Sequence, residues 1–348
     1  IKQTNLSSSS LKKPSIPITE SSSPSMDNGR YRGYVRGTQI ASTVLRFATV
    51  AACSVVFVFA LCKVHRRQDP TRSWVTLYKV AFGLFVVGFW LSSIARLISR
   101  LYGDHIAVID DPYDLPASFI AISHLVSVGS FFGSIADILV LLALVKLASG
   151  IRSLYSGEAL AENRVIRIGS LIFAAILGIL WVIHFGIQEW DTADGPWYPR
   201  APSLISPQYR DLIGLIGSVL EYLFTLLVLV WAVHVIIRSR TRSTPDVKKA
   251  AIYLAVCCAL MSLRVTWLIC DSAFDFSLVS QKAVFTFLTI LYIVFAIWPL
   301  AVLFIVLFRL GCRKKLGLEK PVSSATYPDH PVERDTAHGQ PWEHVQNY

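Results

Sequence analysis

Polar residues recur at regular spacing inside one long apolar segment, and they are the first candidates for chemistry in this chain. The intervals between them are 4, 3, 4 and 3 residues: Ser123, Ser127, Ser130, Ser134 and Asp137. On an α-helix this spacing places all five side chains along one stripe. A serine hydroxyl can bond to a carbonyl one turn earlier and serve only packing, whereas a carboxylate lacks that option. The stripe therefore predicts either a packing face or a polar path along the helix, and packing explains Asp137 least well.

Four further ionisable residues come from four other apolar segments: Arg46, His184, Glu221 and Arg264. Each lies 15 to 17 residues from a basic residue that flanks its segment, which is roughly 22–25 Å along a helix. These four residues are therefore predicted to share one layer of a membrane. Asp137, counted from Lys146 in the same way, lies only roughly 14 Å from the flanking charge. Ionisable residues inside a membrane are costly, and they usually face the interior of a helix bundle or a cavity.

Glu221 and Arg264 match in depth on consecutive antiparallel segments, so we predict an ion pair between them. Two roles are open for this pair: it holds the two helices together, or it lines a ligand pocket that opens outward. The candidate pocket combines the pair with a histidine and aromatic walls: His184, Glu221, Arg264, Trp267, Trp181 and Tyr222. Arg46 has a further option, because its long side chain can extend to the outer headgroups.

Several other chemistries fit the sequence poorly. Retinal binding needs a lysine within the last apolar segment, and Lys282 lies only at its outer edge. A metal site from His124 and His184 is disfavoured because the two histidines differ in depth. The chain has no Gly-rich phosphate loop and no His-Glu-x-x-His motif, so neither a metal nor a cofactor is expected. A membrane-embedded cyclase that uses an intramembrane carboxylic acid stays open, because a buried carboxyl group can hold a proton.

Seven long apolar runs must position these residues, at about 39–62, 74–100, 117–146, 168–189, 212–238, 249–271 and 283–309. Each has the ~20 residues that an α-helix needs to cross a bilayer core. Lys and Arg crowd the first, third and fifth connectors and the segment after the last run. Because positively charged loops stay on the cytoplasmic side, the N-terminus is predicted outside and the C-terminus in the cytoplasm. Arg30, Arg32 and Arg36, just before the first run, disagree with this orientation without reversing it.

The third run is predicted to lie at the centre of the bundle. Gly129 and Gly133 stand beside its polar stripe as a pair of small residues, which lets neighbouring helices approach closely. A helix with both features needs neighbours on several sides.

Composition supports an all-α, polytopic membrane protein: 53% of the 348 residues are hydrophobic and 16% are charged, with a mean hydropathy of +0.52. A soluble domain carries roughly 25% charged residues. The basic residues behind the net charge of +10 flank apolar spans. Membrane lipids with anionic headgroups are therefore the expected partners, and nucleic acid is not. The six cysteines lie within or beside the runs, which implies no disulfide framework.

The seven-helix transmembrane domain is assigned to residues 39–310, between two tails predicted to be disordered, 1–38 and 311–348. The first tail is rich in Ser and Pro and cannot bury enough apolar surface to order itself. It stays open whether residues 1–25 belong to the mature protein. Asn5 lies in a glycosylation sequon, and Cys312, beside basic residues at the cytoplasmic face, is a candidate for lipidation.

Seven spans with an outside N-terminus and basic inner loops resemble G-protein-coupled receptors in topology, although the Asp-Arg-Tyr and Asn-Pro-x-x-Tyr motifs of those receptors are missing. Three short segments are more specific: Ser-Trp-Val-Thr-Leu at 73–77, Ala-Arg-Leu at 95–97 and Leu-Arg-Val-Thr-Trp at 263–267. They are similar to loose motifs of uncharacterised seven-helix membrane proteins of filamentous fungi, over most of residues 40–310. That resemblance implies a fold and no established activity. A more distant similarity, to fungal lipid-translocating seven-helix proteins, includes an arginine in the sixth helix.

Two function classes lead. In the first, the protein is a receptor-like sensor whose outward-facing polar pocket binds a small-molecule or lipid ligand, with a cytoplasmic partner at the basic inner loops. In the second, it is a transporter or lipid translocator with a polar path along the third helix. A membrane-embedded enzyme ranks third. A pocket that ends above Asp137 favours the receptor, and a polar path that continues to the cytoplasmic face favours the transporter. The plasma membrane is the default location, with an endomembrane as the alternative.

Overall fold

The computed structural model describes residues 28–64, 73–106, 117–156, 164–193, 207–242, 245–277 and 288–312. These ranges are almost entirely helical, and seven helices are long and apolar enough to cross a membrane. The prediction of an all-α bundle with seven membrane-compatible helices is confirmed at this level. The orientation of the bundle, with the N-terminus outside, stays a prediction.

The first six helices are α1 (Asn28–Lys63), α2 (Trp74–Ile106), α3 (Ala117–Ser156), α4 (Arg164–Ala193), α5 (Pro207–Arg242) and α6 (Pro245–Ser277). The seventh span, Leu288–Cys312, contains the π-helical turn η2 (Ile293–Ile297), which is followed by α8 (Trp298–Cys312). Helices α5 and α6 both begin at a proline. This residue suits the first helical turn, because its missing N–H would have no partner there.

Some boundaries differ from those predicted. Helix α1 begins at Asn28, within the range assigned to the first tail, and α3 continues to Ser156 instead of ending near residue 146. The predicted start of the seventh span, at 283, lies outside the described residues, which resume at 288. Basic residues such as Lys146 and Arg152 do not end α3, because both types are good helix formers. A drop in hydropathy therefore marks the edge of the apolar span and not the end of the helix.

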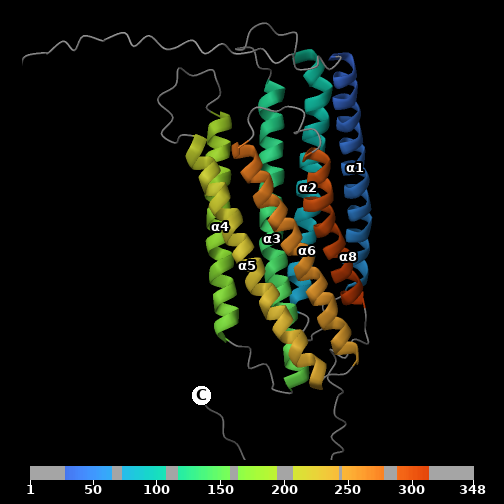
Figure 1. Cartoon of the computed structure of the whole chain (residues 1–348), viewed down its shortest axis with the longest axis vertical. Helices are drawn as coiled ribbons and strands as arrows, with labels where there is room; N and C mark the ends of the chain where they lie inside the picture. Colours follow the sequence, from blue (N-terminus) through green and yellow to red (C-terminus); the bar gives the residue numbers. More distant parts are fainter. Residues whose placement is uncertain are drawn as a thin grey trace, which may run out of the picture.

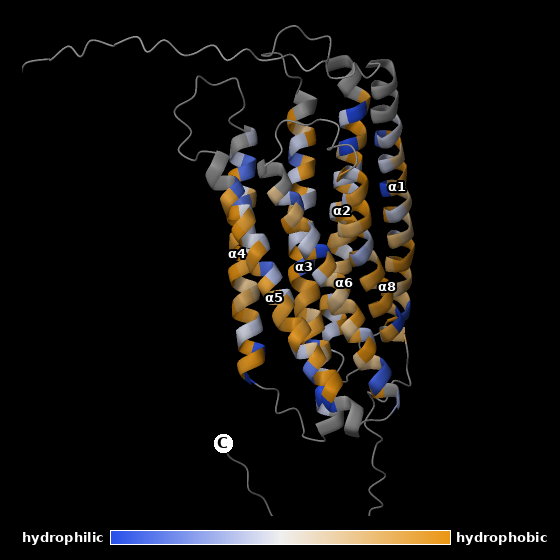
Figure 2. Ribbon diagram, in the orientation of Figure 1, coloured by the Kyte–Doolittle hydropathy of each residue, from blue (hydrophilic) through white to orange (hydrophobic). Residues whose placement is uncertain are grey.

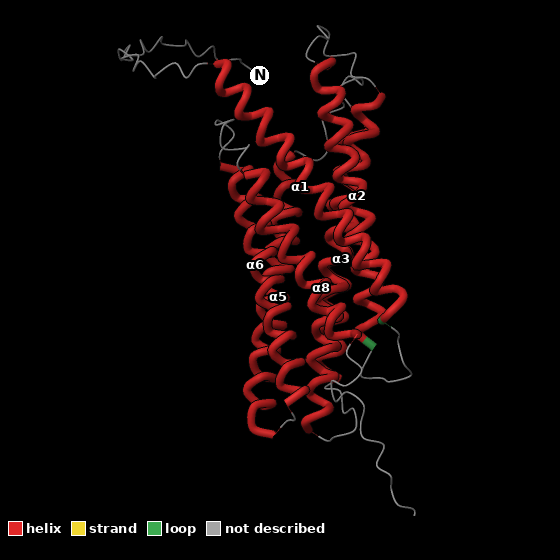
Figure 3. The backbone as a smooth tube through the Cα atoms, turned by 90° about the vertical axis from the view of Figure 1, so that its right-hand side faces the viewer, coloured by secondary structure: helices red, strands yellow, loops and turns green. Residues whose placement is uncertain are grey.

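Helix α3 lies at the centre of the bundle, where it contacts α2, α4, α5 and α6. In Figure 1, α4 and α1 lie at opposite edges, and α1 packs against α2 and α8. Figure 3, turned by 90°, shows that the helices follow the same long axis. We call the end at which α1 begins and α2 ends the upper end, as drawn in Figure 1, and the opposite end the lower end. The predicted central position of the third span is confirmed.

Helices α2 and α3 approach each other closely at a pair of glycines. A Cβ atom on Gly88 would lie 2.7 Å from the carbonyl oxygen of Gly129, and one on Gly129 would lie 2.7 Å from the carbonyl oxygen of Gly88. Gly133, the other member of the predicted small-residue pair, has nothing within 4 Å of its Cβ position. The close approach therefore uses Gly129, with Gly88 as its counterpart.

The outer surface of the bundle is apolar. Figure 2 shows hydrophobic residues along the middle of the helices. Helix α4, for example, exposes a series of large aliphatic side chains: Val165, Ile168, Leu171, Ile172, Ile176, Ile179, Val182 and Ile183. A soluble monomer rarely exposes an apolar face of this extent. In lipid an apolar face has a suitable surrounding, and an α-helix leaves no unpaired backbone group there, because it satisfies its own backbone hydrogen bonds. The structure is thus that expected of an integral, multi-pass membrane protein.

Aromatic packing holds the lower half of the bundle together. Phe82 of α2 stacks on Phe304 of α8 with ring centroids 4.4 Å apart, and the Tyr78 hydroxyl donates a hydrogen bond to the Phe304 carbonyl at 3.2 Å. Buried apolar side chains of α3 and α6 continue this core: Leu141, Leu144, Leu147, Ile151, Leu254 and Met261. The lower half therefore has an apolar core around α3, and the polar groups of the α3 stripe stand above it.

Candidate functional site

A buried ion pair joins α3 to α6. The Arg264 guanidinium donates from Nε to Asp137 Oδ1 at 3.1 Å and from Nη2 to Asp137 Oδ2 at 2.8 Å. Both residues are almost fully buried, with 7% of Arg264 and 2% of Asp137 exposed. A two-point contact between a guanidinium and a carboxylate is the strong form of this interaction. Each charge thus has the partner that a buried ion requires.

The same guanidinium also reaches the seventh span. Arg264 Nη1 donates to the carbonyl oxygen of Ala296, which lies in the π-helical turn η2. Trp267, one turn after Arg264 on α6, stacks on Phe295 of η2 with ring centroids 5.1 Å apart. Single π-helical turns inside a helix are frequent at functional positions. Helices α3 and α6 and the seventh span therefore meet at Arg264.

The structure gives Arg264 a different partner from the one predicted. Arg264 pairs with Asp137, although Glu221 of α5 is close enough to interact electrostatically with both. Glu221 is only 2% exposed, and its Oε1 has no hydrogen-bond partner among the described residues. We call these three residues, Asp137, Glu221 and Arg264, the buried charge cluster. It holds two carboxyl groups around one guanidinium.

The difference comes from the depth assigned to Asp137. Counting from Lys146 places Asp137 roughly 14 Å up the helix, but α3 continues to Ser156. Arg152, whose guanidinium lies 5.3 Å from the centroid of the Trp231 ring, is a better reference and places Asp137 roughly 22 Å up. That is the depth predicted for Arg264. The longer third helix therefore brings the two side chains to one level.

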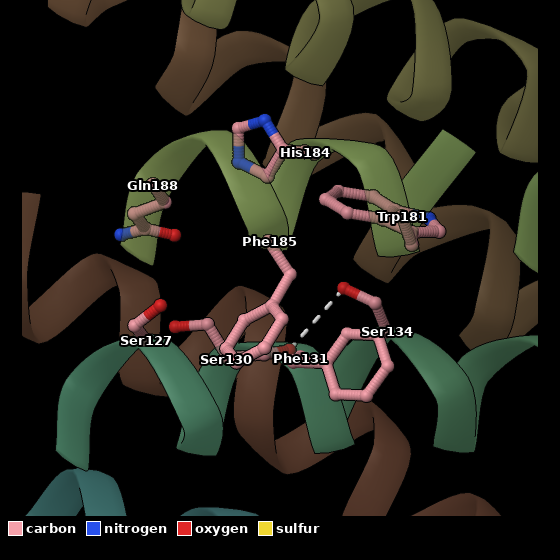
Figure 4. A pocket seen from close by; sticks show the side chains of 8 residues that line it. All are labelled: Ser127, Ser130, Phe131, Ser134, Trp181, His184, Phe185 and Gln188. Atoms are coloured by element: carbon pink, nitrogen blue, oxygen red, sulfur yellow. Dashed lines mark hydrogen bonds between the residues drawn. The ribbon is translucent and has the colours of Figure 1, made fainter. Parts of the chain in front are cut away.

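A pocket lies between α3 and α4, on the upper side of the ion pair. Figure 4 shows the side chains that line it: Ser127, Ser130, Phe131, Ser134, Trp181, His184, Phe185 and Gln188. The cavity measures about 40 Å³, and one water molecule needs only about 10–15 Å³ of such space. It therefore has room for a few water molecules or for one small polar group. Asp137 follows Ser134 by one turn of α3.

The lining combines apolar walls with a few polar groups. Phe131 and Phe185 stack across the helix interface with ring centroids 4.8 Å apart. Ser127 Oγ and Trp181 Nε1 are buried without a hydrogen-bond partner among the described residues. An apolar pocket with a small number of placed polar groups is the usual composition of a small-molecule site. None of the lining residues is a carboxylate, so a carboxylic acid of the kind expected for a cyclase does not line the cavity.

Polar contacts bridge α3 and α4 above the pocket. The hydroxyl oxygens of Ser123 and Thr192 lie 3.4 Å apart, and His124 Nδ1 contacts Glu189 Oε2. Each contact joins one residue of α3 to one of α4. Together they hold the upper parts of the two helices side by side.

Helix α5 supports the pocket from behind. A Cβ atom on Gly214 would lie 3.1 Å from the His184 ring, and one on Gly217 would lie 3.7 Å from the Trp181 ring. The Trp181 and His184 rings themselves meet edge to face, with centroids 5.5 Å apart. Because glycine has no side chain, α5 can lie directly against the two rings, which restricts how far they can turn away from the cavity.

The predicted site residues divide between two places. His184 and Trp181 line the α3–α4 pocket beside three serines of the polar stripe, so part of the predicted pocket and part of the predicted polar path form one site. Tyr222 is half-buried against the apolar core, Trp267 stacks on η2, and neither lines the pocket. The remaining predicted members belong to the buried charge cluster.

Three lining residues, Phe131, Phe185 and Gln188, are absent from the predicted site. The sequence does carry a signal for two of them, because Trp181, His184, Phe185 and Gln188 recur at intervals of 3, 1 and 3 residues. Such intervals place them on one face of a helix. A prediction based on ionisable residues passes over this face, since most of its members are aromatic or neutral.

Among the residues that the structure describes, no three His, Cys, Asp or Glu side chains come together as metal ligands. All six cysteines are free thiols. Cys312, the last residue of α8, is half-buried, and its lipidation stays a prediction. Asn5 and its sequon lie outside the described residues, as do residues 1–25 as a whole.

No protein-family model matches this chain, and comparisons with curated proteins and with solved structures find no match either. Function must therefore be inferred from the geometry of the site itself.

Proposed function

We propose that this protein is a receptor-like sensor that binds a small ligand with a polar group in the α3–α4 pocket. The polar group would bond to Ser127, whose buried hydroxyl lacks a described partner. Because the cavity itself holds only a small group, the apolar part of the ligand would lie against Phe131 and Phe185 and extend past exposed Ser130. Both kinds of contact are needed for a selective small-molecule site, because apolar walls supply affinity and placed polar groups supply orientation.

One observation carries this proposal: the buried polar side chains of α3 stop at Asp137. Above Asp137, three serines of the polar stripe line the pocket. Below it, the buried side chains in the described part of α3 are apolar, from Ile138 to Ile151. Leu254 and Met261 of α6 are buried in the same half. A ligand that enters from the upper end would therefore meet a dead end, which suits a receptor better than a transporter.

The buried charge cluster supports a route from the pocket to the rest of the bundle. Arg264 bonds at once to Asp137 of α3 and to Ala296 of η2. A buried two-point ion pair tolerates little displacement, because a separated charge in a low-dielectric interior is strongly destabilised. A ligand that moves α3 would thus also move α6 or η2. Helices α5 and α6 are joined at the lower end, where the basic connector would be the docking point for a cytoplasmic partner.

A transporter or lipid translocator is the second candidate, and Glu221 favours it. The guanidinium of Arg264 is bonded to Asp137, so Glu221 has no counter-charge of its own and needs a proton or a cation. Exchange of such a proton is a common device of membrane transporters. This hypothesis requires a path below Asp137 that opens in another conformation. An embedded enzyme has less support, because no carboxyl group lines the pocket.

Side-specific labelling tests whether the pocket is blind. In a variant whose six native cysteines are replaced by serine, Ser130→Cys places a thiol in the pocket and Leu144→Cys places one below Asp137. A membrane-impermeant thiol reagent is applied to one side or the other of sealed vesicles. We expect Ser130→Cys to react only from the side of the upper end and Leu144→Cys from neither side.

Reaction of Ser130→Cys from both sides, or of Leu144→Cys from the lower side, would overturn the receptor proposal and favour a translocator. Absence of any reaction at Ser130→Cys would contradict an accessible pocket in either class. Ser272→Cys, at an exposed position near the upper end of α6, is the matched control that reports which side the reagent reaches.

A further inference from the structure

Arg46 of α1 is a buried cation with hydrogen-bond donors left over. It is 4% exposed, and its Nε and Nη2 have no hydrogen-bond partner among the described residues. A guanidinium carries five N–H donors and keeps its charge in proteins. Burial without a counter-charge is strongly destabilising for such a group. The described residues therefore do not give Arg46 the counter-charge and hydrogen-bond acceptors that a buried guanidinium requires.

The neighbours of Arg46 add positive charge instead of compensating it. Arg96 and Arg100 of α2 lie within electrostatic reach of Arg46, and no described carboxylate is among the groups that act on it. The Arg46 guanidinium lies 5.4 Å from the centroid of the Tyr292 ring, a cation–π contact. That contact supplies some attraction, but it leaves Nε and Nη2 without a described hydrogen-bond acceptor, and it brings no negatively charged partner.

Contacts with α1 hold Arg100 in place beside Arg46. Arg100 donates from Nη1 to the Gln39 carbonyl and from Nη2 to Ser42 Oγ at 3.1 Å. Ser42 precedes Arg46 by one helical turn, so both lie on the same face of α1. The interface between α1 and α2 thus concentrates three guanidinium groups, which we call the arginine cluster: Arg46, Arg96 and Arg100.

We propose that the arginine cluster binds a phosphate-bearing anion between α1 and α2. Guanidinium groups bond to phosphate oxygens through parallel N–H donors, and one phosphate has enough oxygens to meet more than one arginine. Such an anion pairs the open donors of Arg46 and removes the repulsion within the cluster. The site shares no residue with the α3–α4 pocket, so it stands independently of the proposed function.

A phospholipid headgroup and free phosphate are the two sources of this chemistry. Arg96 is exposed, as are Ile40 and Val44 of α1, so the cluster borders the lipid-facing surface. Arg46 lies nine residues inside the apolar span Gly37–Lys63, and Arg100 lies at the upper end of the span Trp74–Leu101. Long arginine side chains near a membrane surface reach toward headgroups. The position of the cluster therefore makes a lipid the first source to test.

Thermal unfolding of the full chain in neutral detergent tests the site. The probes are phosphatidic acid, diacylglycerol as the same lipid without its phosphate, and inorganic phosphate. Arg46→Gln removes the buried charge, and Arg309→Gln, at an exposed arginine of α8, is the matched control. We expect phosphatidic acid, and not diacylglycerol, to raise the unfolding midpoint of the wild type and of Arg309→Gln. Half-saturation should need about tenfold more lipid for Arg46→Gln.

The order of the unfolding midpoints of the wild type and Arg46→Gln gives a second test. Without an anion, Arg46→Gln should unfold at a higher temperature than the wild type, because it lacks the unpaired charge. With saturating phosphatidic acid the order should reverse. A purely structural role for Arg46 would keep the order the same in both conditions.

The other outcomes are also decisive. A stabilising effect of inorganic phosphate as well as phosphatidic acid assigns a free anion, and an effect of the lipid alone assigns a headgroup; both support the site. No shift with either probe, or equal shifts in the wild type and Arg46→Gln, would overturn it. If Arg46→Gln does not fold, Arg96→Gln, an exposed member of the same cluster, replaces it, with binding expected to be about threefold weaker.

Discussion

Arg264 ties the interior of the bundle together as a single side chain. It bonds to Asp137 and to Ala296, and Glu221 lies within electrostatic reach. On a protein surface such bonds replace bonds to water and contribute little. In the buried centre of a membrane-compatible bundle water is not a ready substitute, so loss of one partner leaves an uncompensated charge. The two acidic neighbours should differ sharply in this respect, because only Asp137 is bonded to the guanidinium.

Asp137→Asn removes the counter-charge of Arg264, and we expect it to lower the free energy of unfolding by about 3–5 kcal/mol. Glu221→Gln, the matched change on α5, should alter it by less than about 1 kcal/mol. The reason is that a neutral amide replaces a carboxyl group that has no counter-charge of its own. Unfolding of the purified variants in mixed micelles with a denaturing detergent measures both values. Equal losses would mean that the two carboxyl groups share Arg264, which contradicts the bonding of Arg264 to Asp137 alone of the two.

Helix α3 shows how far the sequence predicts the site and where it stops. The spacing of its polar residues predicts the face on which Ser127, Ser130 and Ser134 line the pocket, because helical periodicity alone fixes a face. The partner of Asp137 depends on the length of α3 beyond the apolar span, where hydropathy carries no signal. The π-helical turn η2 cannot be predicted from the sequence either, because it accompanies tertiary contacts such as the one between Trp267 and Phe295.

The contact between α2 and α3 depends on the absence of side chains. Gly88→Ala would place a Cβ atom 2.7 Å from the Gly129 carbonyl oxygen and 2.9 Å from Phe132 Cβ, so the two helices must separate. We expect a loss of about 1–3 kcal/mol in the free energy of unfolding. Gly133→Ala, with nothing within 4 Å, should be neutral or stabilising by up to about 1 kcal/mol, because alanine favours a helix. Detergent unfolding compares the pair, and equal stability of the two variants would exclude the close approach.

The whole molecule distributes polarity unevenly between its two ends. The α3–α4 pocket and the arginine cluster lie toward the upper end, whereas α2, α3, α6 and α8 bury an aromatic and aliphatic core toward the lower end. The proposed receptor requires such a distribution, because its ligand would enter from one side of a membrane only. Which side of the membrane that is depends on the orientation of the bundle. The charges of the connectors predict this orientation, and the helix packing does not define it.

Orientation can be measured with one cysteine at each end of the bundle. In the cysteine-free background, Ser272→Cys lies near the upper end of α6 and Lys63→Cys at the lower end of α1, both at exposed positions. Since basic connectors gather at the lower end and such loops stay in the cytoplasm, an impermeant thiol reagent should label Ser272→Cys on intact cells. Lys63→Cys should react only after permeabilisation. The reverse pattern would mean that Arg30, Arg32 and Arg36 decide the topology, and the pocket would then receive an intracellular ligand with its geometry unchanged.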